Sequence, residues 1–485
     1  MVKFKEILVF VALAALMGGV IWMQRHPKYS WERDLGQRLA ADFNRTEAEV
    51  KEYIAGYVPE VTDEQIAAWT ASGKLESMKI GGRRMYFRNA GPNLFRIDPA
   101  LAAIKAAREK AEAAETGAPR DSALKGHEAI DARTIPAIMD QVRAKLAERQ
   151  PASWNVPEDG TAFLALPKRM RVTFTLTVPA NTLRPRKTLR CWLPYPRSDV
   201  ARQSDIRFIE AGVDNVAYSP DRIIFSDPSC PHSSLYMEAR TRRDRATTFY
   251  EIFEYTSAGE WHPIDSSKVL PYDTESPAYK RYTADREKHV IVTPRIRALA
   301  DSLTRGLANP YSQARALFSW IDASFPWASA REYSTLENIP EYVLASGHGD
   351  CGQVTLLFMT LCRAKGIPTQ WQSGLMMHPG DKNLHDWGQV YFEGVGWVPV
   401  DQSFGIPSFA RGACLDRHPG ADFFFLGGIE PYRLVVNSDF GGQLSPEKKF
   451  PRSDTVDFQR GEVEWDFGNL YYNQWDYSFH IEYLN

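Results

Sequence analysis

Apolar and polar positions follow a helical period over most of the first third of the chain. Two segments, 46–49 and 62–65, carry the Thr-x-x-Glu/Gln pattern of a capping box, in which two side chains satisfy the first free amides of a helix. Residues 75–87 predict a hairpin that turns at two glycines, and the Ala/Glu/Lys-rich run 100–117 predicts a further helix before a polar, linker-like stretch. We therefore expect a mainly helical N-terminal region with one β-hairpin over residues 29–160.

From about residue 165 the pattern changes to strict alternation of apolar and polar residues. The run 170–178 (MRVTFTLTV) places its apolar side chains on one face and its Arg and Thr side chains on the other, as in a strand with one buried face. The same alternation returns at 189–193 and 235–239, and clusters of Pro, Asn, Asp and Ser separate the runs. This pattern predicts a β-sandwich domain over residues 165–262.

A proline-rich passage joins the predicted sandwich to the rest of the chain, where helices come first and strands follow. Residues 293–306 and 311–325 have helical periodicity, whereas the apolar runs beyond residue 384 alternate as strands do. We expect an α+β domain over residues 280–485 that includes the C-terminal strands. The fold class expected for the whole chain is α+β.

The N-terminus has the pattern of an export signal. Two lysines precede an uncharged run at residues 7–23 (ILVFVALAALMGGVIWM), and polar residues follow it. The run is slightly shorter than the roughly 20 residues that cross a bilayer, and no clear small-x-small cleavage site follows it. Residues 1–28 therefore fit either a cleaved signal peptide or an uncleaved membrane anchor. Both place the chain in the periplasm or at the cell surface.

The composition limits the classes of partner that the chain can bind and bears on the oxidation state of its cysteines. A chain of 485 residues with 44% hydrophobic residues has material for two or three packed domains, and a net charge of −2 gives no electrostatic basis for a nucleic-acid partner. An odd count of five cysteines leaves at least one free thiol in an oxidising compartment. A Cys191–Cys230 disulfide, which would contribute about 4 kcal/mol, and a pair of buried thiols both fit the sequence.

One cysteine, Cys351, lies at a position that is expected to make its thiol more reactive. Apolar residues recur at helical spacing from Val354 to Cys362, and Gly366 follows where a left-handed cap is needed, so a helix is predicted over 351–365. Cys351 opens this helix, where unpaired amides and the helix dipole stabilise a thiolate. A cysteine near a helix start is more often a packing residue, and Cys362 on the apolar stripe is expected to be one. Cys351 therefore needs a partner before it can be assigned a reaction.

A histidine and an aspartate on a predicted hairpin supply that partner. His385 lies on one strand and Asp401 on the next, and a turn near residue 393 places them opposite each other with both side chains on one face. The carboxylate can then orient the imidazole, with the other ring nitrogen expected to point to Cys351. Asp386 points to the opposite face by strand parity.

Two other histidines compete for a role at this site. His348 lies three residues before Cys351, a spacing also found in zinc sites, and His378 precedes the strand of His385. No second ligand pair accompanies the His348–Cys351 spacing, so we expect no metal and no cofactor, and we interpret His348 as a residue at the rim of the cleft.

These residues together resemble the transglutaminase-like superfamily, and most closely its bacterial exported branch. The resemblance extends over roughly residues 293–405. The matching blocks are Gly349-Asp350-Cys351-Gly352-Gln353, Cys362-Arg363-Ala364-Lys365-Gly366-Ile367-Pro368, Gly374, His385-Asp386-Trp387 and Val400-Asp401.

The resemblance implies a papain-like α+β core and a catalytic triad. It implies Cys351 as the nucleophile, His385 as general base and acid, and Asp401 as the residue that orients the histidine. Trp327 matches an aromatic residue found near the oxyanion in this family, and Gln353 is a further candidate near the site. No calcium-loop pattern is present.

Two functions from different classes fit the sequence. The first is an exported cysteine enzyme that acts on amide bonds of proteins or peptides through a thioester acyl-enzyme, by hydrolysis or by transfer. The second is a catalytically silent cell-surface binding module that keeps the fold.

Overall fold

The computed structural model describes residues 31–115, 126–148 and 161–484. The predicted export signal at residues 1–28 lies outside these residues. In the described part of the chain, no helix has both the length and the apolar character needed to cross a membrane.

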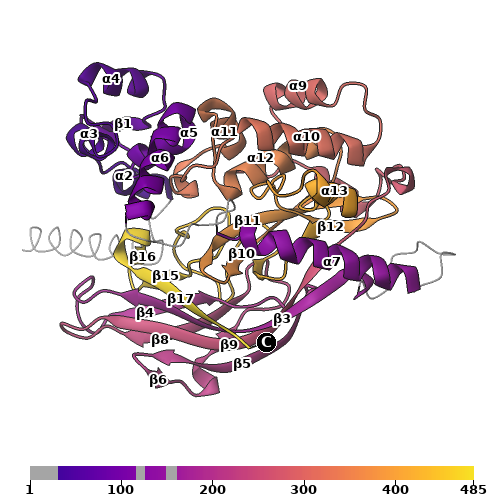
Figure 1. The fold of residues 1–485 in the computed structure, drawn as a ribbon. Helices are drawn as coiled ribbons and strands as arrows, with labels where there is room; N and C mark the ends of the chain where they lie inside the picture. The colour runs from indigo at the N-terminus through magenta and orange to yellow at the C-terminus, as the bar shows by residue number, and fades with distance from the viewer. Residues whose placement is uncertain (1–30, 116–125, 149–160, 485) are drawn as a thin grey trace, which may run out of the picture.

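Residues 31–115 form a small helical module with its own core, which we call the N-terminal module (indigo and violet in Figure 1). Its elements are α2 (Trp31–Asp42), α3 (Glu47–Ala55), α4 (Asp63–Ala71), β1 (Ser77–Ile80), β2 (Arg83–Tyr86), α5 (Ala90–Ile97) and α6 (Pro99–Glu115). Both predicted capping boxes are present, with Thr46 and Thr62 each accepting a hydrogen bond from the amide three residues later. Phe87 and Leu94 are fully buried in the core, so the module is held by its own hydrophobic cluster.

Helix α7 (Glu128–Glu148) packs in a different place from the module. Its buried side chains Ile138 and Met139 belong to the core of the last domain, and the helix lies along β3 (Leu164–Val178) and β9 (Thr247–Trp261) (Figure 1). The region predicted as one unit over residues 29–160 is therefore divided between the module and this helix.

The predicted β-sandwich is present as two antiparallel sheets. One sheet has the order β17-β3-β9-β5-β6, with β13 paired to β9, and the other has the order β16-β15-β4-β8-β7. Val172, Phe174 and Leu176 of β3 are fully buried between them, as the alternation predicts. The remaining strands are β4 (Thr188–Pro194), β5 (Gln203–Val213), β6 (Val216–Ala217), β7 (Ile224–Phe225), β8 (Ser234–Arg240), β13 (Gly428–Ile429), β15 (Glu462–Trp465), β16 (Gly468–Leu470) and β17 (Asp476–Tyr483).

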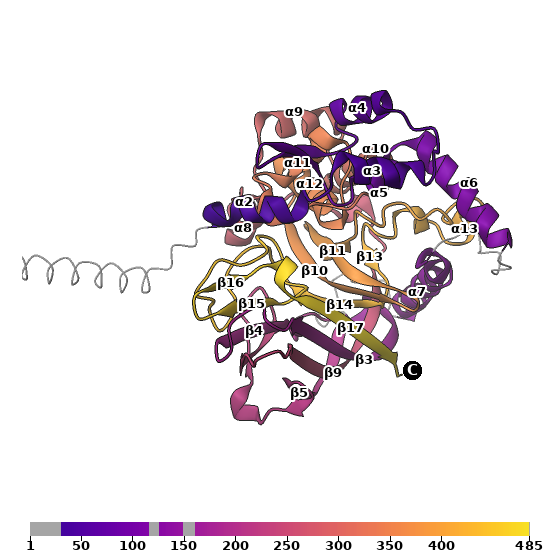
Figure 2. The same cartoon turned by 90° about the vertical axis from the view of Figure 1, so that its left-hand side faces the viewer.

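The C-terminal strands belong to the sandwich, which corrects the boundary predicted at 280–485. Strand β17 pairs with β3 from Asp476↔Thr177 to Tyr483↔Met170, and β15 pairs with β4. Figure 2 shows β17 lying against β3 at the side of the sandwich. The chain returns to the sandwich because the backbone groups at the edge of β3 need partners, and local alternation carries no sign of which strand supplies them.

The last domain packs helices against a four-stranded antiparallel sheet of order β12-β11-β10-β14 (Figure 1). Its elements are α8 (Pro277–Thr283), α9 (Pro294–Leu303), α10 (Pro310–Ser324), α11 (Ile339–Ser346), α12 (Cys351–Ala364), β10 (Thr369–His378), β11 (Asp381–Phe392), β12 (Gly396–Val400), α13 (Ala413–Arg417) and β14 (Arg433–Asn437). Helix α12 is the central helix: Leu357, Phe358 and Leu361 are fully buried, and Gly366 follows it at φ +72° as predicted.

All five cysteines lie in the described part of the chain, and each is a free thiol. Cys191 is buried in the sandwich core and Cys230 is only partly buried. The structure therefore supports free thiols rather than a Cys191–Cys230 disulfide, although only Cys191 is a buried one.

Candidate active site

Cys351 is the first residue of α12, and a capping box fixes the backbone on either side of it. The Asp350 side chain accepts a hydrogen bond from the amide of Gln353 at 3.0 Å, and the Gln353 side chain accepts one from the amide of Asp350 at 3.3 Å. Gln353 is fully buried in this cap and does not line the cavity described next. Its role in the structure is to start the helix at Cys351.

A cavity of about 190 Å³ opens beside Cys351. One wall comes from residues 327–333, which we call the rim segment, and the remaining walls come from the start of α12, the start of β11 and residues 454–460. Acidic side chains outnumber basic ones in the lining of this cavity. The acidic ones are Glu332, Asp350, Asp386, Asp454 and Asp457, and the basic ones are Arg331 and Arg460.

The thiol of Cys351 donates a hydrogen bond to a carboxylate. Its Sγ lies 3.4 Å from Oδ2 of Asp386. The Tyr333 hydroxyl lies 2.7 Å from Oδ1 of Asp350 and 3.2 Å from Oδ2 of Asp386, within donating distance of both. Gln459 donates from Nε2 to the other oxygen of Asp386. Asp386 thus accepts hydrogen bonds from Gln459 and from the candidate nucleophile, and the Tyr333 hydroxyl lies nearby.

The pKa of the Cys351 thiol is shifted opposite to the expected direction. Burial raises this pKa well above its ordinary value, and the charges of Asp386 and Asp350 raise it further. These effects therefore outweigh the lowering of the thiol pKa that the helix N-terminus was expected to cause. Burial and Asp386 also raise the pKa of Asp350 to about 7, so these carboxyl groups hold protons more tightly than exposed ones do. In this arrangement the resting thiol is protonated.

His385 and Asp401 form the predicted pair. Nε2 of His385 lies 2.7 Å from Oδ2 of Asp401, and both side chains are buried. Asp401 Oδ1 accepts hydrogen bonds from the amides of Ser403 and Phe404. The register places Gly388 opposite Val400, so His385 and Asp401 are not directly opposite as predicted, and His385 reaches Asp401 diagonally across the two strands.

Arg433 completes this pair from β14. Its Nη1 lies 2.8 Å from Oδ2 of Asp401, and its guanidinium also contacts Glu430. Burial alone would raise the pKa of Asp401, but the charges of His385 and Arg433 outweigh it and hold that pKa well below its usual range. Asp401 is therefore ionised, as a residue that orients a histidine must be.

His385 and Cys351 do not meet in this structure. Among the described residues, no hydrogen bond or ion pair joins the thiol to the imidazole ring, although both groups have partners of their own. Strand parity explains this: Asp386 shares its face with Gly388 and Val390, which pack towards α12, and His385 points to the other face. Asp386 and His385 point to opposite faces of β11, as predicted. Cys351, however, lies on the side of Asp386 and not on the side of His385.

A signal for this arrangement was present in the sequence. In β11, Gly388, Val390 and Phe392 have the parity of Asp386, whereas the residues with the parity of His385 are Trp387, Gln389 and Tyr391. The face that packs on a core helix is the apolar one. That rule would have placed Asp386, rather than His385, next to the first turn of α12.

The other four candidate residues lie in different environments. Trp327 lines the cavity with 44% of its surface exposed. Its backbone forms an isolated parallel β-bridge with Gly349, just before α12. His348 is buried outside the cavity lining, and burial lowers its pKa to about 4. His378 is fully buried, and its Nε2 lies 3.0 Å from Asp131 of α7. Cys362 is fully buried in the core, as expected for a packing residue.

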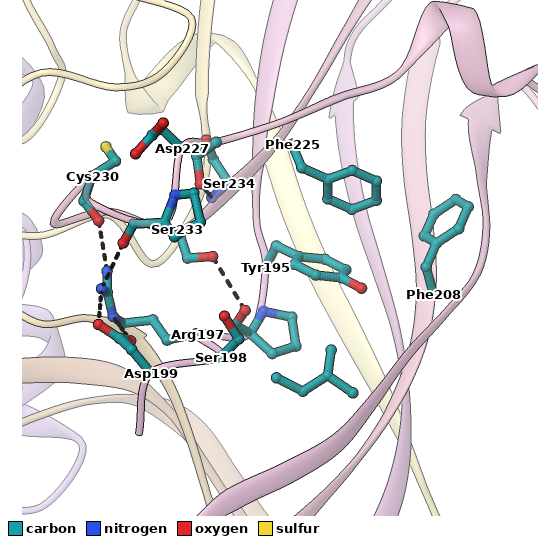
Figure 3. A pocket seen from close by; sticks show the side chains of 14 residues that line it. Tyr195, Arg197, Ser198, Asp199, Phe208, Phe225, Asp227, Cys230, Ser233 and Ser234 are labelled. Carbon is teal, nitrogen blue, oxygen red and sulfur yellow. Dashed lines mark hydrogen bonds and ion pairs between the residues drawn. The ribbon is translucent and has the colours of Figure 1, made fainter. Parts of the chain in front are cut away.

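A second cavity, of about 400 Å³, lies in the sandwich. Figure 3 shows Tyr195, Phe208 and Phe225 on one side of it and the Arg197–Asp199 ion pair on the other. The Arg197 guanidinium is saturated by Asp199 and by the carbonyls of residues 228 and 230. Its charge is not free for a ligand, and this cavity is not the candidate active site.

Comparison with known proteins gives a family for the last domain. Residues 297–402 match the transglutaminase-like superfamily. A curated relative, the uncharacterized protein YebA of Bacillus subtilis, is 25% identical over 147 residues, which are 26% of this chain and 20% of YebA. The match therefore spans about a fifth of that relative's length.

Two solved structures show weaker likeness. A candidate cysteine protease from Cytophaga hutchinsonii has 13% identity and a TM-score of 0.42, covering 67% of this chain and 93% of its own. The periplasmic domain of TgpA from Pseudomonas aeruginosa has 16% identity and a TM-score of 0.26, covering 52% of this chain and 92% of its own. The sequence match covers α12, Cys351 and the His385–Asp401 pair. Residues 297–402 therefore form a domain of the transglutaminase-like superfamily.

Proposed function

We propose that the chain is an exported cysteine enzyme that acts on amide bonds of protein or peptide substrates. The observation that carries this proposal is Cys351 at the open end of α12, in a cavity, within the segment that matches the transglutaminase-like superfamily. Export is supported by the basic start and apolar run at residues 7–23.

The proposed reaction passes through a thioester. The Cys351 thiol loses its proton, Sγ attacks the carbonyl carbon of the amide, and the C–N bond breaks. Ammonia or an amine leaves after taking a proton, and water or an incoming amine then breaks the thioester and restores the thiol. His385 is proposed as the proton carrier, and ionised Asp401 as the group that orients and stabilises the imidazolium.

The structure adds a requirement to this scheme. Because the resting thiol donates to Asp386, it must leave that carboxylate before its proton can pass to His385. Because His385 also points to the face of β11 opposite Cys351, the proposal requires β11 to rearrange near residue 385 on binding substrate, so that the imidazole turns towards Sγ. Asp386 stabilises the protonated thiol and opposes this change.

Substitution of Cys351 tests the proposal. Cys351→Ala is expected to abolish turnover of peptide amides, measured as ammonia or amine release with and without an added primary amine. Cys362→Ala serves as the matched control, since Cys362 is buried in the core away from the cavity. The proposal is wrong if purified Cys351→Ala keeps substantial turnover.

The silent binding module is a second candidate, and one observation favours it. The carboxylates beside Cys351 raise the thiol pKa, which is the opposite of what a reactive cysteine needs. A thiol-reactive probe at neutral pH separates the two. An enzyme is labelled at Cys351 faster in the presence of a substrate analogue that shifts the thiol, whereas a silent module is labelled slowly in both conditions.

A further inference from the structure

We infer that the N-terminal module supports the wall of the Cys351 cavity that the rim segment forms, with Asn93 and Arg96 as positioning residues for Trp327. This inference rests on the proposed function. The rim segment, residues 327–333, stands between the module and the cavity: its residues line the cavity, and its outer side is bound by the module.

The first contact is made by Asn93 of α5. Its side chain donates to the carbonyl of Ser329 at 2.8 Å and accepts from the amide of Ser329 at 2.9 Å. Asn93 is 4% exposed. A buried amide that satisfies both backbone groups of one residue fixes that residue's position and orientation.

The second contact is made by Arg96, one turn further along α5. Its guanidinium lies over the Trp327 ring at 4.9 Å and donates to the side chains of Asn93 at 2.9 Å and Ser329 at 3.0 Å. A cation over an indole face is attracted by the ring's quadrupole. Arg96 therefore holds the ring of Trp327 from the module side.

A third contact secures the far end of the rim segment. The amide of Glu332 donates to Asp42 at 2.8 Å, and Arg88 lies 2.9 Å from both Asp42 and Glu332. Glu332 also pairs with Arg460, at the other side of the cavity, at 2.9 Å. Helices α2 and α5 of the module thus bind both ends of the rim segment.

The inner side of the rim segment faces the candidate nucleophile. The amide of Ala328 donates to the carbonyl of Gly349 at 3.0 Å, two residues before Cys351. The Tyr333 hydroxyl contacts Asp350 and Asp386. A shift of the rim segment away from the module would therefore move Trp327 and the surroundings of the thiol together.

A supporting module and an inhibitory module predict opposite changes in activity when the contact is loosened. An inhibitory module would cover the site, and loosening it would raise activity. Trp327 instead remains 44% exposed beside the cavity while Arg96 holds it, so the module supports the wall and leaves it open. Loosening the contact should weaken substrate binding.

The test uses the full chain and variants of α5. Arg96→Gln is expected to lower kcat/KM for a peptide amide about two- to fivefold, mostly through a higher KM, because an exposed cation–π contact is of that strength. Arg96→Lys keeps the cation and should restore most of the loss. Asn93→Ala/Arg96→Gln should lower kcat/KM about tenfold, since two further hydrogen bonds are lost. The matched control is Arg84→Gln, an exposed arginine of the same module whose guanidinium contacts Ser77.

A second measurement does not depend on turnover. The acrylamide quenching of Trp327, taken as the difference between the wild type and Trp327→Phe, should increase in Arg96→Gln and stay unchanged in Arg84→Gln. If the wild type shows no turnover, the proposed function fails while quenching still tests the positioning. Unchanged quenching and unchanged KM in the double variant, or higher activity in any α5 variant, would overturn the inference.

Discussion

Asp386→Asn should make the Cys351 thiol more reactive at low pH. The substitution keeps the shape of the side chain but removes a negative charge beside Sγ. A carboxylate stabilises the neutral thiol, by accepting its hydrogen bond, and destabilises the thiolate by repulsion. Both effects raise the pKa of the thiol, so removal of the charge lowers that pKa.

The separation of the two groups sets the size of the effect. Two unit charges 3.4 Å apart repel by about 5 kcal/mol at an effective dielectric constant of about 20. That energy corresponds to between about 3 and 4 pKa units. Burial also raises the pKa of Asp386, which favours its uncharged form and reduces this repulsion. The full Coulomb repulsion is therefore an upper limit, and we expect the thiol pKa to fall and the alkylation profile to move to lower pH.

The assay is the rate of alkylation by iodoacetamide against pH, with peptide mapping to confirm Cys351 as the labelled residue. Iodoacetamide is neutral, so the pocket charge does not alter its local concentration. Asp454→Asn is the matched control, because Asp454 lines the same cavity without contacting the thiol. A profile for Asp386→Asn that overlies the wild type, or lies at higher pH, would refute the reasoning.

Three further predictions follow from the same groups. Burial, with the charges of Asp386 and Asp454, raises the pKa of Asp457 well above its ordinary value, so folding favours its protonated form and stability falls as pH rises above about 4. Asp457→Asn should accordingly raise Tm at pH 8 and change it little at pH 4, by calorimetry; a larger gain at pH 4 would contradict the sign. His385→Ala should lose nearly as much kcat as Cys351→Ala, whereas Asp401→Asn should retain more, and equal mild losses from both would point to another base. Cys362→Ala should lower the free energy of unfolding by about 1 to 2 kcal/mol while native protein keeps its kcat, so a loss of kcat in fully folded protein would assign Cys362 to the site.

Local signals in the sequence were sufficient for the helix of Cys351 and for the His385–Asp401 pair. The apolar stripe from Val354 and the glycine at 366 define α12, because helix formation depends on neighbours three and four residues away. The pairing of His385 with Asp401 follows from the two-residue period of a hairpin. These features need no knowledge of distant parts of the chain.

Local patterns could place Asp350 and Asp386 beside the thiol, but they could not give its burial or the far wall of its cavity. The carboxylates that raise the pKa of Cys351 come from its own cap and from β11, and the cavity is closed by residues 454–460, about a hundred residues further on. The helix dipole was the local effect, and burial with two nearby negative charges outweighed it. The prediction that the C-terminal strands belong to the last domain was wrong for a related reason, since strand pairing between residues so far apart in the chain leaves no local pattern.

The most direct test of the central claim is capture of the thioester on Cys351. Protein mixed with a peptide amide substrate and quenched in acid within the first turnover should carry the acyl group on the peptide that contains Cys351, detected by mass spectrometry. The adduct should disappear after hydroxylamine and be absent from Cys351→Ala. Turnover without any adduct on Cys351, or an adduct that persists in Cys351→Ala, would contradict the assignment of Cys351 as the nucleophile.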